Sequence, residues 1–597
     1  MNDQQRPRTP DAVVPVAAVP DAAPASRAFD GTWDLVAEFL ARQGVDTVFG
    51  LPGDDVLVVS AFERAGIRLV WCRDQRLAVH MASGYAVTSG RTGVCVVGKG
   101  PAVANAVGGL LEAATGCSPV LLLAGGTAVE SEGARTFQDA PALALAAPVT
   151  KWAGRVTHPD RLLPALRRAA ALVREAPRGP VFLEIPDGFL EQRFEVVEHL
   201  LDSRPPLPAR YTAPEPPAEV SGAKRPVVLA GGGLRGARVP GAAERLAEAL
   251  GAALLVTASG RGSVAESHPL FCGLAGLYAQ PPVRTLLDDC DLVVTLGSRL
   301  EETATEGLPQ GVPVCQVNVD ADEFSYDWPG PLVHGDAAAT AHHWADALGT
   351  GAAGAGRETG PTRPADGGWT CRITAVRRDL EAWAALPAHP ELPDDQVRVK
   401  AVVREISRAL PERAVVVHEN GLMDIWSYLY PVLRLPAGTR SVVPSEQTTL
   451  GYGAAAAAGA KLAAPEAPVV AIVGDGAFDL LRVELPTLLR ERIGLTYVIL
   501  DNGGYGWLQR MVDNLDGPPH LFTADDPARP EFDGGVLTWT VAKPADTAEA
   551  LRAAMSAAAE GRVAVVRVRC SADDWPPVTG VASDEEIRAC AAPAGPR

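Results

Sequence analysis

Two glycine-rich turns, each directly after an apolar run, carry the residues best suited to chemistry. Val469–Val473 runs into Gly474-Asp475-Gly476, and a later apolar run ends in Asp501-Asn502-Gly503-Gly504, which places Asn502 27 residues after Asp475. Glycines at the end of a strand let the backbone approach a phosphate, and Asp and Asn oxygens are ligands that Mg²⁺ accepts. A Gly-Asp-Gly run alone is also an ordinary turn. The two turns together therefore indicate a site for a magnesium-bound phosphate group.

The elements that must position these turns follow an α/β pattern. Short apolar runs alternate with helical patterns from Thr32 to about Pro577, which is typical of parallel sheets covered by helices on both faces. The expected strands are Thr47–Phe49, Val94–Val97, Val120–Ala124 and Val181–Ile185 in a first group, Pro226–Ala230, Ala253–Val256, Leu292–Leu296 and Val314–Val319 in a second, and Ala414–Val417, Val469–Val473, Tyr497–Leu500 and Val563–Val568 in a third. The sequence therefore predicts three doubly wound parallel-sheet α/β domains.

Composition sets the expected boundaries of these domains. Residues 1–29 are rich in Ala and Pro and are expected to be a disordered tail. Pro-rich residues 203–220 and a segment over residues 349–390 that begins rich in Gly and Ala are expected to be linkers. The predicted domains are then residues 30–202, 221–348 and 391–580, followed by a C-terminal tail over residues 581–597.

Charge and cysteine content exclude several classes of partner. The 597 residues carry a formal net charge of -18, whereas nucleic acids and anionic membranes require a basic face. The nine cysteines include no CxxC pair, which favours a reducing compartment. No stretch supplies the roughly 20 apolar residues of a membrane span. We therefore expect a cytoplasmic protein that binds small molecules and neither nucleic acid nor membrane.

The segment from Val469 to Gly504 closely resembles the diphosphate-binding domain of thiamine-diphosphate enzymes of the acetolactate synthase and pyruvate decarboxylase type. The motif of that family is GDG followed at this spacing by an Asn. The resemblance implies that Gly474 and Gly476 approach the diphosphate of the cofactor. It also implies three Mg²⁺ ligands, the side chains of Asp475 and Asn502 and the carbonyl of Gly504. Asp501 departs from the usual Asn-Asn pair but leaves the implied ligand in place.

Two more loops are implied to contact the cofactor. Thr448-Thr449-Leu450-Gly451 precedes an alanine-rich helical pattern. In the family, a bulky apolar side chain at the Leu450 position wedges between the two rings of the cofactor, and the carbonyl at the Thr448 position accepts a hydrogen bond from its pyrimidine amino group. The turn after Ala414–Val417, with Glu419 and Gly421, resembles the family's other diphosphate-contacting turn, although it matches less well.

The amino-terminal domain resembles the pyrimidine-binding domain of the same family. Phe49-Gly50-Leu51-Pro52-Gly53-Asp54 matches its FGxPG turn, Gly84-Tyr85-Ala86 its GYA, and Gly100-Pro101 through Asn105 its glycine-proline loop. The resemblance covers nearly all of residues 32–575 and implies pyrimidine-binding, middle and diphosphate-binding domains in that order. It also implies a homodimer or tetramer, with the cofactor between the first domain of one subunit and the third domain of another.

One position departs from the family in a way that bears on catalysis. The family places a glutamate ten residues before the Tyr of GYA, and this chain has Gln75 there. The usual carboxyl group hydrogen-bonds the pyrimidine N1′ and assists the proton transfers that activate the cofactor, and such help contributes roughly 10² to 10⁴ in rate. A glutamine can hydrogen-bond N1′ but cannot exchange a proton at ordinary pH. We expect an active enzyme with retuned proton transfer, the alternative being a protein that binds cofactor without efficient turnover.

The implied reaction is decarboxylation of a 2-keto acid, followed by protonation of the acyl carbanion or its addition to a second carbonyl. Simple decarboxylases of the family pair the acid at the Asp54 position with adjacent histidines, whereas this chain has Gly125-Gly126-Thr127 in the corresponding loop. Phe137-Gln138 is more similar to acetolactate synthases, so we expect a carboligase. Its expected catalytic residues are Gln75, Asp54 and Leu450. Candidate contacts for the keto-acid carboxylate, which needs cationic or amide donors, are Lys99, Gln138, Arg76 and Trp507.

A further departure concerns FAD, which acetolactate synthases bind. Gly297–Thr303 resembles the stretch where they place an arginine that contributes to FAD binding, and Thr303 occupies the arginine position, which leaves FAD doubtful.

Two alternative functions share the motifs above. One is a carbon-carbon lyase, decarboxylase or diketone hydrolase, and the other is a non-catalytic, cofactor-binding regulatory subunit.

Overall fold

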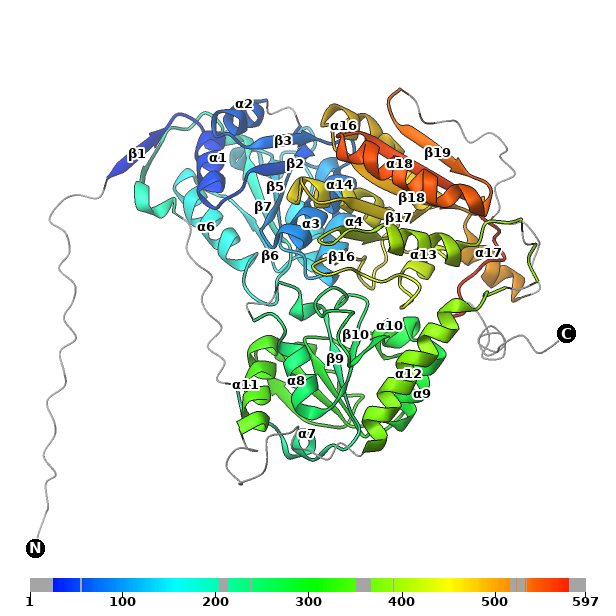
Figure 1. Ribbon diagram of the computed structural model, residues 1–597. Helices are drawn as coiled ribbons and strands as arrows, with labels where there is room; N and C mark the ends of the chain where they lie inside the picture. The colour runs from blue at the N-terminus through cyan, green and yellow to red at the C-terminus, as the bar shows by residue number, and fades with distance from the viewer. Residues whose placement is uncertain are drawn as a thin grey trace, which may run out of the picture.

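Three parallel six-stranded sheets organise the protein, and helices cover their faces (Figure 1). The computed structural model describes residues 25–53, 56–202, 213–236, 239–350, 367–389, 391–393, 395–515, 522, 532 and 534–578. Asp54 and the predicted tail over residues 581–597 lie outside the described residues. The predicted fold class, three doubly wound α/β domains, is confirmed.

The first and third sheets share one topology. The first has the order β3-β2-β4-β5-β7-β6 and the third the order β16-β15-β17-β18-β20-β19, so that both read 2-1-3-4-6-5 when their strands are numbered along the chain. The strands of the first sheet are β2 (Thr47–Leu51), β3 (Arg68–Trp71), β4 (Gly93–Val97), β5 (Val120–Gly126), β6 (Trp152–Arg155) and β7 (Val181–Pro186). Those of the third are β15 (Val415–His418), β16 (Arg440–Val442), β17 (Val469–Gly474), β18 (Leu495–Asp501), β19 (Leu537–Val541) and β20 (Val563–Arg569).

The middle sheet is wound differently. Its order β11-β10-β9-β12-β13-β14 reads 3-2-1-4-5-6, the strand order of dinucleotide-binding domains. Its strands are β9 (Pro226–Ala230), β10 (Ala253–Val256), β11 (Phe271–Leu274), β12 (Leu292–Leu296), β13 (Val314–Asn318) and β14 (Leu332–His334).

The first and third domains share a buried core at the crossing of α3 (Gln75–Ser89) and α14 (Tyr452–Ala463). Small residues let the two helices approach closely. A Cβ on Gly84 would lie 2.1 Å from the carbonyl oxygen of Ala456, and one on Gly459 would lie 1.8 Å from that of Met81. His80 is buried in the same contact, with its ring 5.4 Å from that of Tyr452.

Two boundaries predicted from composition are wrong. Residues 26–29, predicted to belong to a disordered tail, form β1 (Ser26–Phe29), which pairs antiparallel with β8 (Phe194–Val197). The linker predicted over residues 349–390 contains α12 (Gly367–Ala385), which lies along α9 (Pro281–Asp289) in Figure 1. A stripe of buried residues at helical spacing holds it against the middle domain, namely Trp369, Ile373, Val376, Leu380 and Trp383.

The first three residues of α7 (Ala218–Gly222) fall within the predicted linker over residues 203–220, of which the structure describes residues 213–220. Among the helices of the described residues, none is both long enough and apolar enough to cross a membrane.

Candidate active site

The two glycine-rich turns lie at the carboxyl ends of neighbouring strands. Gly474 at the end of β17 is in register with Leu500 of β18, and Asp475 begins α15 (Asp475–Leu481). The amide of Asn502 lies 3.1 Å from Asp475 Oδ1 and 3.0 Å from the carbonyl oxygen of Gly504, with its oxygen end toward both. Three hydrogen-bond acceptors thus face one another. Either the amide turns over and donates to both oxygens, or a cation lies among them.

The donor set fits a hard cation. One carboxylate, one amide oxygen and one backbone carbonyl are ligands suited to Mg²⁺, which usually keeps water and phosphate oxygens in its other positions. In the described part of the chain, no group of three His, Cys, Asp or Glu residues is placed to hold a metal. A metal at Asp475 would therefore depend on the neutral oxygens of Asn502 and Gly504.

Asp501, which departs from the family's Asn, is directed away from that set. Its Oδ2 accepts a hydrogen bond from Arg567 Nε at 2.6 Å, across the neighbouring strand β20. Its Oδ1 accepts from the backbone N–H of Gly503 at 3.3 Å. Because Arg567 balances its charge, Asp501 is accommodated beside Asn502.

Two buried carboxyl groups lie behind the Gly474 turn. Asp424 is fully buried, and a Cβ on Gly421 would lie 2.7 Å from its Oδ2, so a larger residue at position 421 would displace this carboxyl group. Burial, and then the charge of Glu419, raise the pKa of Asp424 well above its ordinary value. Burial also raises the pKa of Glu419 to about 7. Glu419 Oε2 accepts from the backbone N–H of Ala454 at 3.1 Å, so its carboxyl group caps the start of α14.

The loop before α14 has an unusual backbone conformation. Thr448 has a φ of 47°, in the left-handed region, and Gly451 has a φ of 88°. Glu112 of α4 (Pro101–Thr115) holds this loop, because its carboxylate accepts from the N–H groups of Ser445 at 2.5 Å and Thr449 at 3.0 Å. Leu450 is only partly buried. Strained backbone clusters at functional sites, which supports the predicted roles of Thr448 and Leu450.

Gln75 lies at the amino terminus of α3. Asp74 caps this helix by accepting from the N–H of Leu77 at 2.9 Å. Gln75 Oε1 accepts from Asn105 Nδ2 at 3.1 Å, which joins the starts of α3 and α4. Arg76 extends beside α4, since a Cβ on Gly108 would meet its Cδ at 3.6 Å. In this arrangement the amide oxygen of Gln75 is engaged and its NH₂ group is left as a donor.

The other predicted substrate contacts differ in availability. Lys99 Nζ lies 2.5 Å from Asp187 Oδ2, so its charge is already paired. Gln138 has a φ of 59°, and its backbone packs on Gly100. A Cβ at Gly100 would lie 2.3 Å from the backbone carbonyl oxygen of Gln138. Trp507 lies on α17 (Gly506–Asp513), one turn past the Asn502 loop, and packs partly against the core.

Two buried carboxylates that were not predicted from the sequence join the first and third domains. Glu484, in the third domain, accepts from the N–H groups of Arg73 at 2.6 Å and Asp74 at 2.9 Å, directly before Gln75. Glu112, in the first domain, accepts from the loop before α14. Both are buried, at 0% and 2% exposed. Each is an acidic residue beside Leu residues in a helical segment, which is the only sign of them in the sequence.

The position tied to FAD in acetolactate synthases carries no cation here. The N–H of Thr303 donates to Glu446 Oε1 at 3.2 Å, and its hydroxyl donates to the same oxygen. The Thr303 position therefore faces a carboxylate.

Comparison with known proteins identifies the family. The description "Thiamine pyrophosphate enzyme, N-terminal TPP binding domain" matches residues 32–145, the central domain of the same family matches residues 218–343, and its C-terminal TPP binding domain matches residues 419–568. These matches cover more than half of the chain. The protein is a member of the thiamine pyrophosphate enzymes, as its motifs predict.

Curated relatives span nearly the same length. A probable acetolactate synthase large subunit of Methanocaldococcus jannaschii is 26% identical over 87% of this chain and 89% of its own. A sulfoacetaldehyde acetyltransferase of Castellaniella defragrans is 27% identical over 93% and 96%. The large subunit of acetolactate synthase isozyme 2 of Escherichia coli is 27% identical over 80% and 83%.

Proposed function

We propose that this enzyme decarboxylates a 2-keto acid and transfers the resulting acyl group to a second carbonyl compound. When bound, thiamine diphosphate supplies the nucleophilic carbon and the electron sink for decarboxylation. Asp475, Asn502 and the Gly504 carbonyl would hold the Mg²⁺ that anchors its diphosphate. Relatives named acetolactate synthase and acetyltransferase support acyl transfer in general.

The observation that favours transfer over simple decarboxylation lies at the end of β5. A Cβ on Gly126 would fall 2.7 Å from Glu184 Oε1, so this position has no room for an imidazole. Thr127 next to it donates to Asp139 Oδ1 at 3.2 Å. Without a histidine pair here, protonation of the bound product is slow relative to its addition to a second carbonyl.

Gln75 orients the pyrimidine and leaves its protonation to other groups. Asn105 engages the amide oxygen, so the NH₂ group of Gln75 can donate to the pyrimidine N1′. An amide cannot take up or release a proton at ordinary pH. Turnover therefore proceeds without the carboxyl group on which relatives with a glutamate rely.

A second copy of the chain completes the site in this proposal, as a homodimer or tetramer. Large apolar side chains are exposed on both domains that carry candidate site residues. Phe137, beside Gln138, is 74% exposed, and on α17 and just after it Met511 is 50% and Leu515 80% exposed. Such side chains are typical of a surface that a partner covers.

The test incubates the purified protein with Mg²⁺, thiamine diphosphate and a panel of 2-keto acids, alone and with carbonyl acceptors, while CO₂ and product masses are followed. We expect CO₂ release together with a product whose mass is that of the acyl group plus the acceptor. Aldehyde as the main product would instead indicate a decarboxylase or lyase. No turnover, with none gained in Gln75→Glu, would contradict the proposal and favour a non-catalytic subunit.

A further inference from the structure

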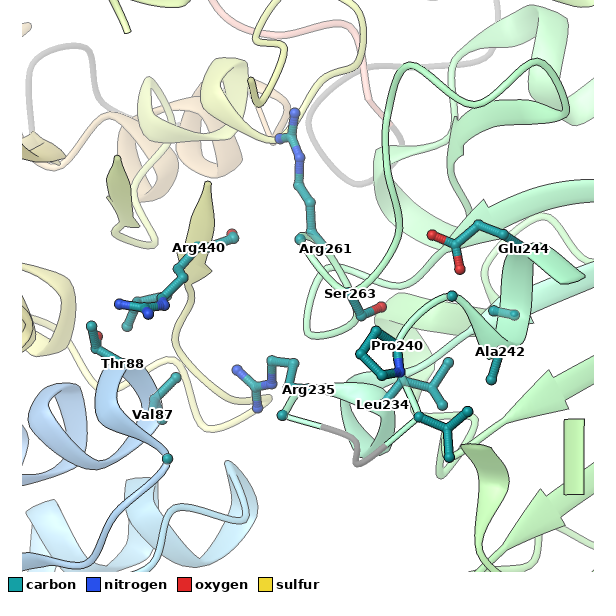
Figure 2. A pocket seen from close by; sticks show the side chains of 18 of the residues that line it. Val87, Thr88, Leu234, Arg235, Pro240, Ala242, Glu244, Arg261, Ser263 and Arg440 are labelled. Atoms are coloured by element: carbon teal, nitrogen blue, oxygen red, sulfur yellow. The ribbon is translucent and has the colours of Figure 1, made fainter. Parts of the chain in front are cut away.

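A pocket of about 350 Å³ lies where the three domains meet (Figure 2). Neither Gln75 nor Asp475 lines it. Its walls come from the end of α3 (Val87–Gly90), the loop after β9 together with the start of α8 (Ala242–Leu250), and β16. The volume exceeds that of an inorganic ion and is within the range of small-molecule sites.

Arg235 lines this pocket, and among the described residues no carboxylate lies within ion-pair distance of it. The guanidinium is partly buried, and its one hydrogen bond in the described structure is a long one, from Nη2 to the carbonyl oxygen of Gly116 at 3.4 Å. Burial lowers the pKa of Arg235, and the more distant charges around it, Arg178 and Glu301, act in opposite directions. A desolvated cation without an anion is costly to the folded state. The charge is therefore available to a ligand.

Three further groups add hydrogen-bond donors. Arg440 reaches toward Thr88 in Figure 2 and has no acidic partner among the described residues. Thr88 and Ser441, residues that are 4% and 5% exposed, also line the pocket, and their hydroxyl groups have no hydrogen-bond partner among the described residues. The first turn of α8 contributes backbone N–H groups, because its N-cap Gly241 offers no side-chain cap. Two arginines that form no ion pair among the described residues thus line one pocket in a chain of net charge -18.

We propose that this pocket is a binding site for a small organic phosphate. Guanidinium groups, hydroxyls and a helix amino terminus together match the oxygens of a phosphate group. Glu244 fits the organic part of the ligand. Its Oε1 accepts from the N–H of Ala265 at 3.1 Å, while its other oxygen has no partner in the described structure and can accept from a ligand hydroxyl. The site touches all three domains, so a bound ligand ties them together.

The test titrates the full-length protein with ribose 5-phosphate, inorganic phosphate and succinate, by calorimetry and thermal unfolding. We expect one ribose 5-phosphate per chain, weaker binding of inorganic phosphate and no binding of succinate. Arg235→Met and Arg440→Gln should each weaken the binding of ribose 5-phosphate by at least about tenfold, because each removes a charge-assisted hydrogen bond to the phosphate. Arg378→Gln is the matched control, since Arg378 is an exposed arginine of α12 paired with Asp379.

The unliganded variant separates a ligand-binding role from a structural one. In the absence of ligand, the Arg235→Met variant should unfold at the same temperature as the parent or at a higher one, because the change removes a buried charge that no described carboxylate contacts. A markedly lower unfolding temperature would show that Arg235 serves the fold and would overturn the proposal. Equal affinity of Arg440→Gln and the parent for ribose 5-phosphate, or no binding of any phosphate, would also overturn it.

Discussion

At the scale of single residues, Gln75 and Asn105 form the pair that most distinguishes the candidate site. The amide oxygen of Gln75 accepts a hydrogen bond from Asn105, so toward a pyrimidine Gln75 can act only as a donor, through its NH₂ group. A glutamate in its place could also exchange a proton. Gln75→Glu should speed hydrogen–deuterium exchange at the reactive carbon of bound thiamine diphosphate by roughly tenfold or more, as measured by rapid quench and NMR. Equal or slower exchange would mean that another group already performs this proton transfer.

His80 gives a prediction on pH dependence. Burial, with a smaller effect from Arg76, lowers the pKa of His80 to about 3 from 6.5. Below pH 6.5 the unfolded chain therefore binds a proton that the folded chain does not, and stability falls as the pH falls. Between pH 7.5 and 5.5, the parent should lose about 1.4 kcal/mol more unfolding free energy than His80→Leu.

Urea unfolding at the two pH values checks this prediction. The control is His158→Gln, which removes an exposed histidine and leaves His80 in place. A parent and a His80→Leu variant with the same pH dependence would contradict the buried neutral state of His80.

At the scale of secondary structure, the sequence predicts the centre of each sheet and misses its edges. All twelve predicted strands exist, four in each six-stranded sheet, and the six strands of these sheets that were missed are the edge strands β3, β6, β11, β14, β16 and β19. Central strands are covered on both faces and form continuous apolar runs. β3 and β19 are only four and five residues long, and each contains exposed residues that interrupt an apolar run. Pairing with a neighbour, rather than local pattern, makes these segments strands.

The crossing of α3 and α14 gives a prediction at the same scale. Gly84→Ala places a methyl group 2.1 Å from the Ala456 carbonyl oxygen, so the helices must separate. We expect a loss of roughly 1–3 kcal/mol or more in unfolding free energy. Gly108→Ala on α4 is the matched control, because its Cβ meets only Arg76 at 3.6 Å. There alanine should be neutral or should stabilise the helix by up to about 1 kcal/mol. Equal effects of the two changes in chemical denaturation would contradict the close contact.

At the scale of the whole molecule, the first and third domains are related by topology and by reciprocal contacts. Each sends one buried carboxylate to the loop that precedes the functional helix of the other, Glu484 to the start of α3 and Glu112 to the start of α14. These contacts link residues more than 300 positions apart. A single sequence does not reveal such pairs, whereas the local motif around Asp475 and Asn502 was sufficient to predict that their side chains lie together.

Glu484→Gln tests this reciprocal arrangement. Loss of the charged acceptor of two backbone N–H groups should cost about 3 kcal/mol of unfolding free energy. Because Arg73 and Asp74 directly precede Gln75, turnover should fall as well. Glu412→Gln, at an exposed position, should change neither quantity. Unfolding by urea and the keto-acid assay give the two readouts, and parental values in both for Glu484→Gln would exclude a positioning role.

Tertiary contacts determine the structure of the two segments whose structure was predicted wrongly. Residues 367–385 were predicted to be linker because a Gly- and Ala-rich composition precedes them, yet Trp369 and Trp383 pack into the middle domain. Ser26–Phe29 form a strand only because Phe194–Val197 lies beside them. In both cases, tertiary contacts decide the structure that composition did not predict.

The most direct measurement of the central claim is calorimetric titration of the full-length protein with thiamine diphosphate, with and without Mg²⁺. Asp475, Asn502 and the Gly504 carbonyl are expected to form one cation site that anchors the diphosphate. The parent should therefore bind the cofactor tightly only with Mg²⁺, and Asp475→Asn should weaken Mg²⁺-dependent binding by about tenfold or more. Binding that is unaffected by Mg²⁺ and by Asp475→Asn, or no binding at all, would contradict the account.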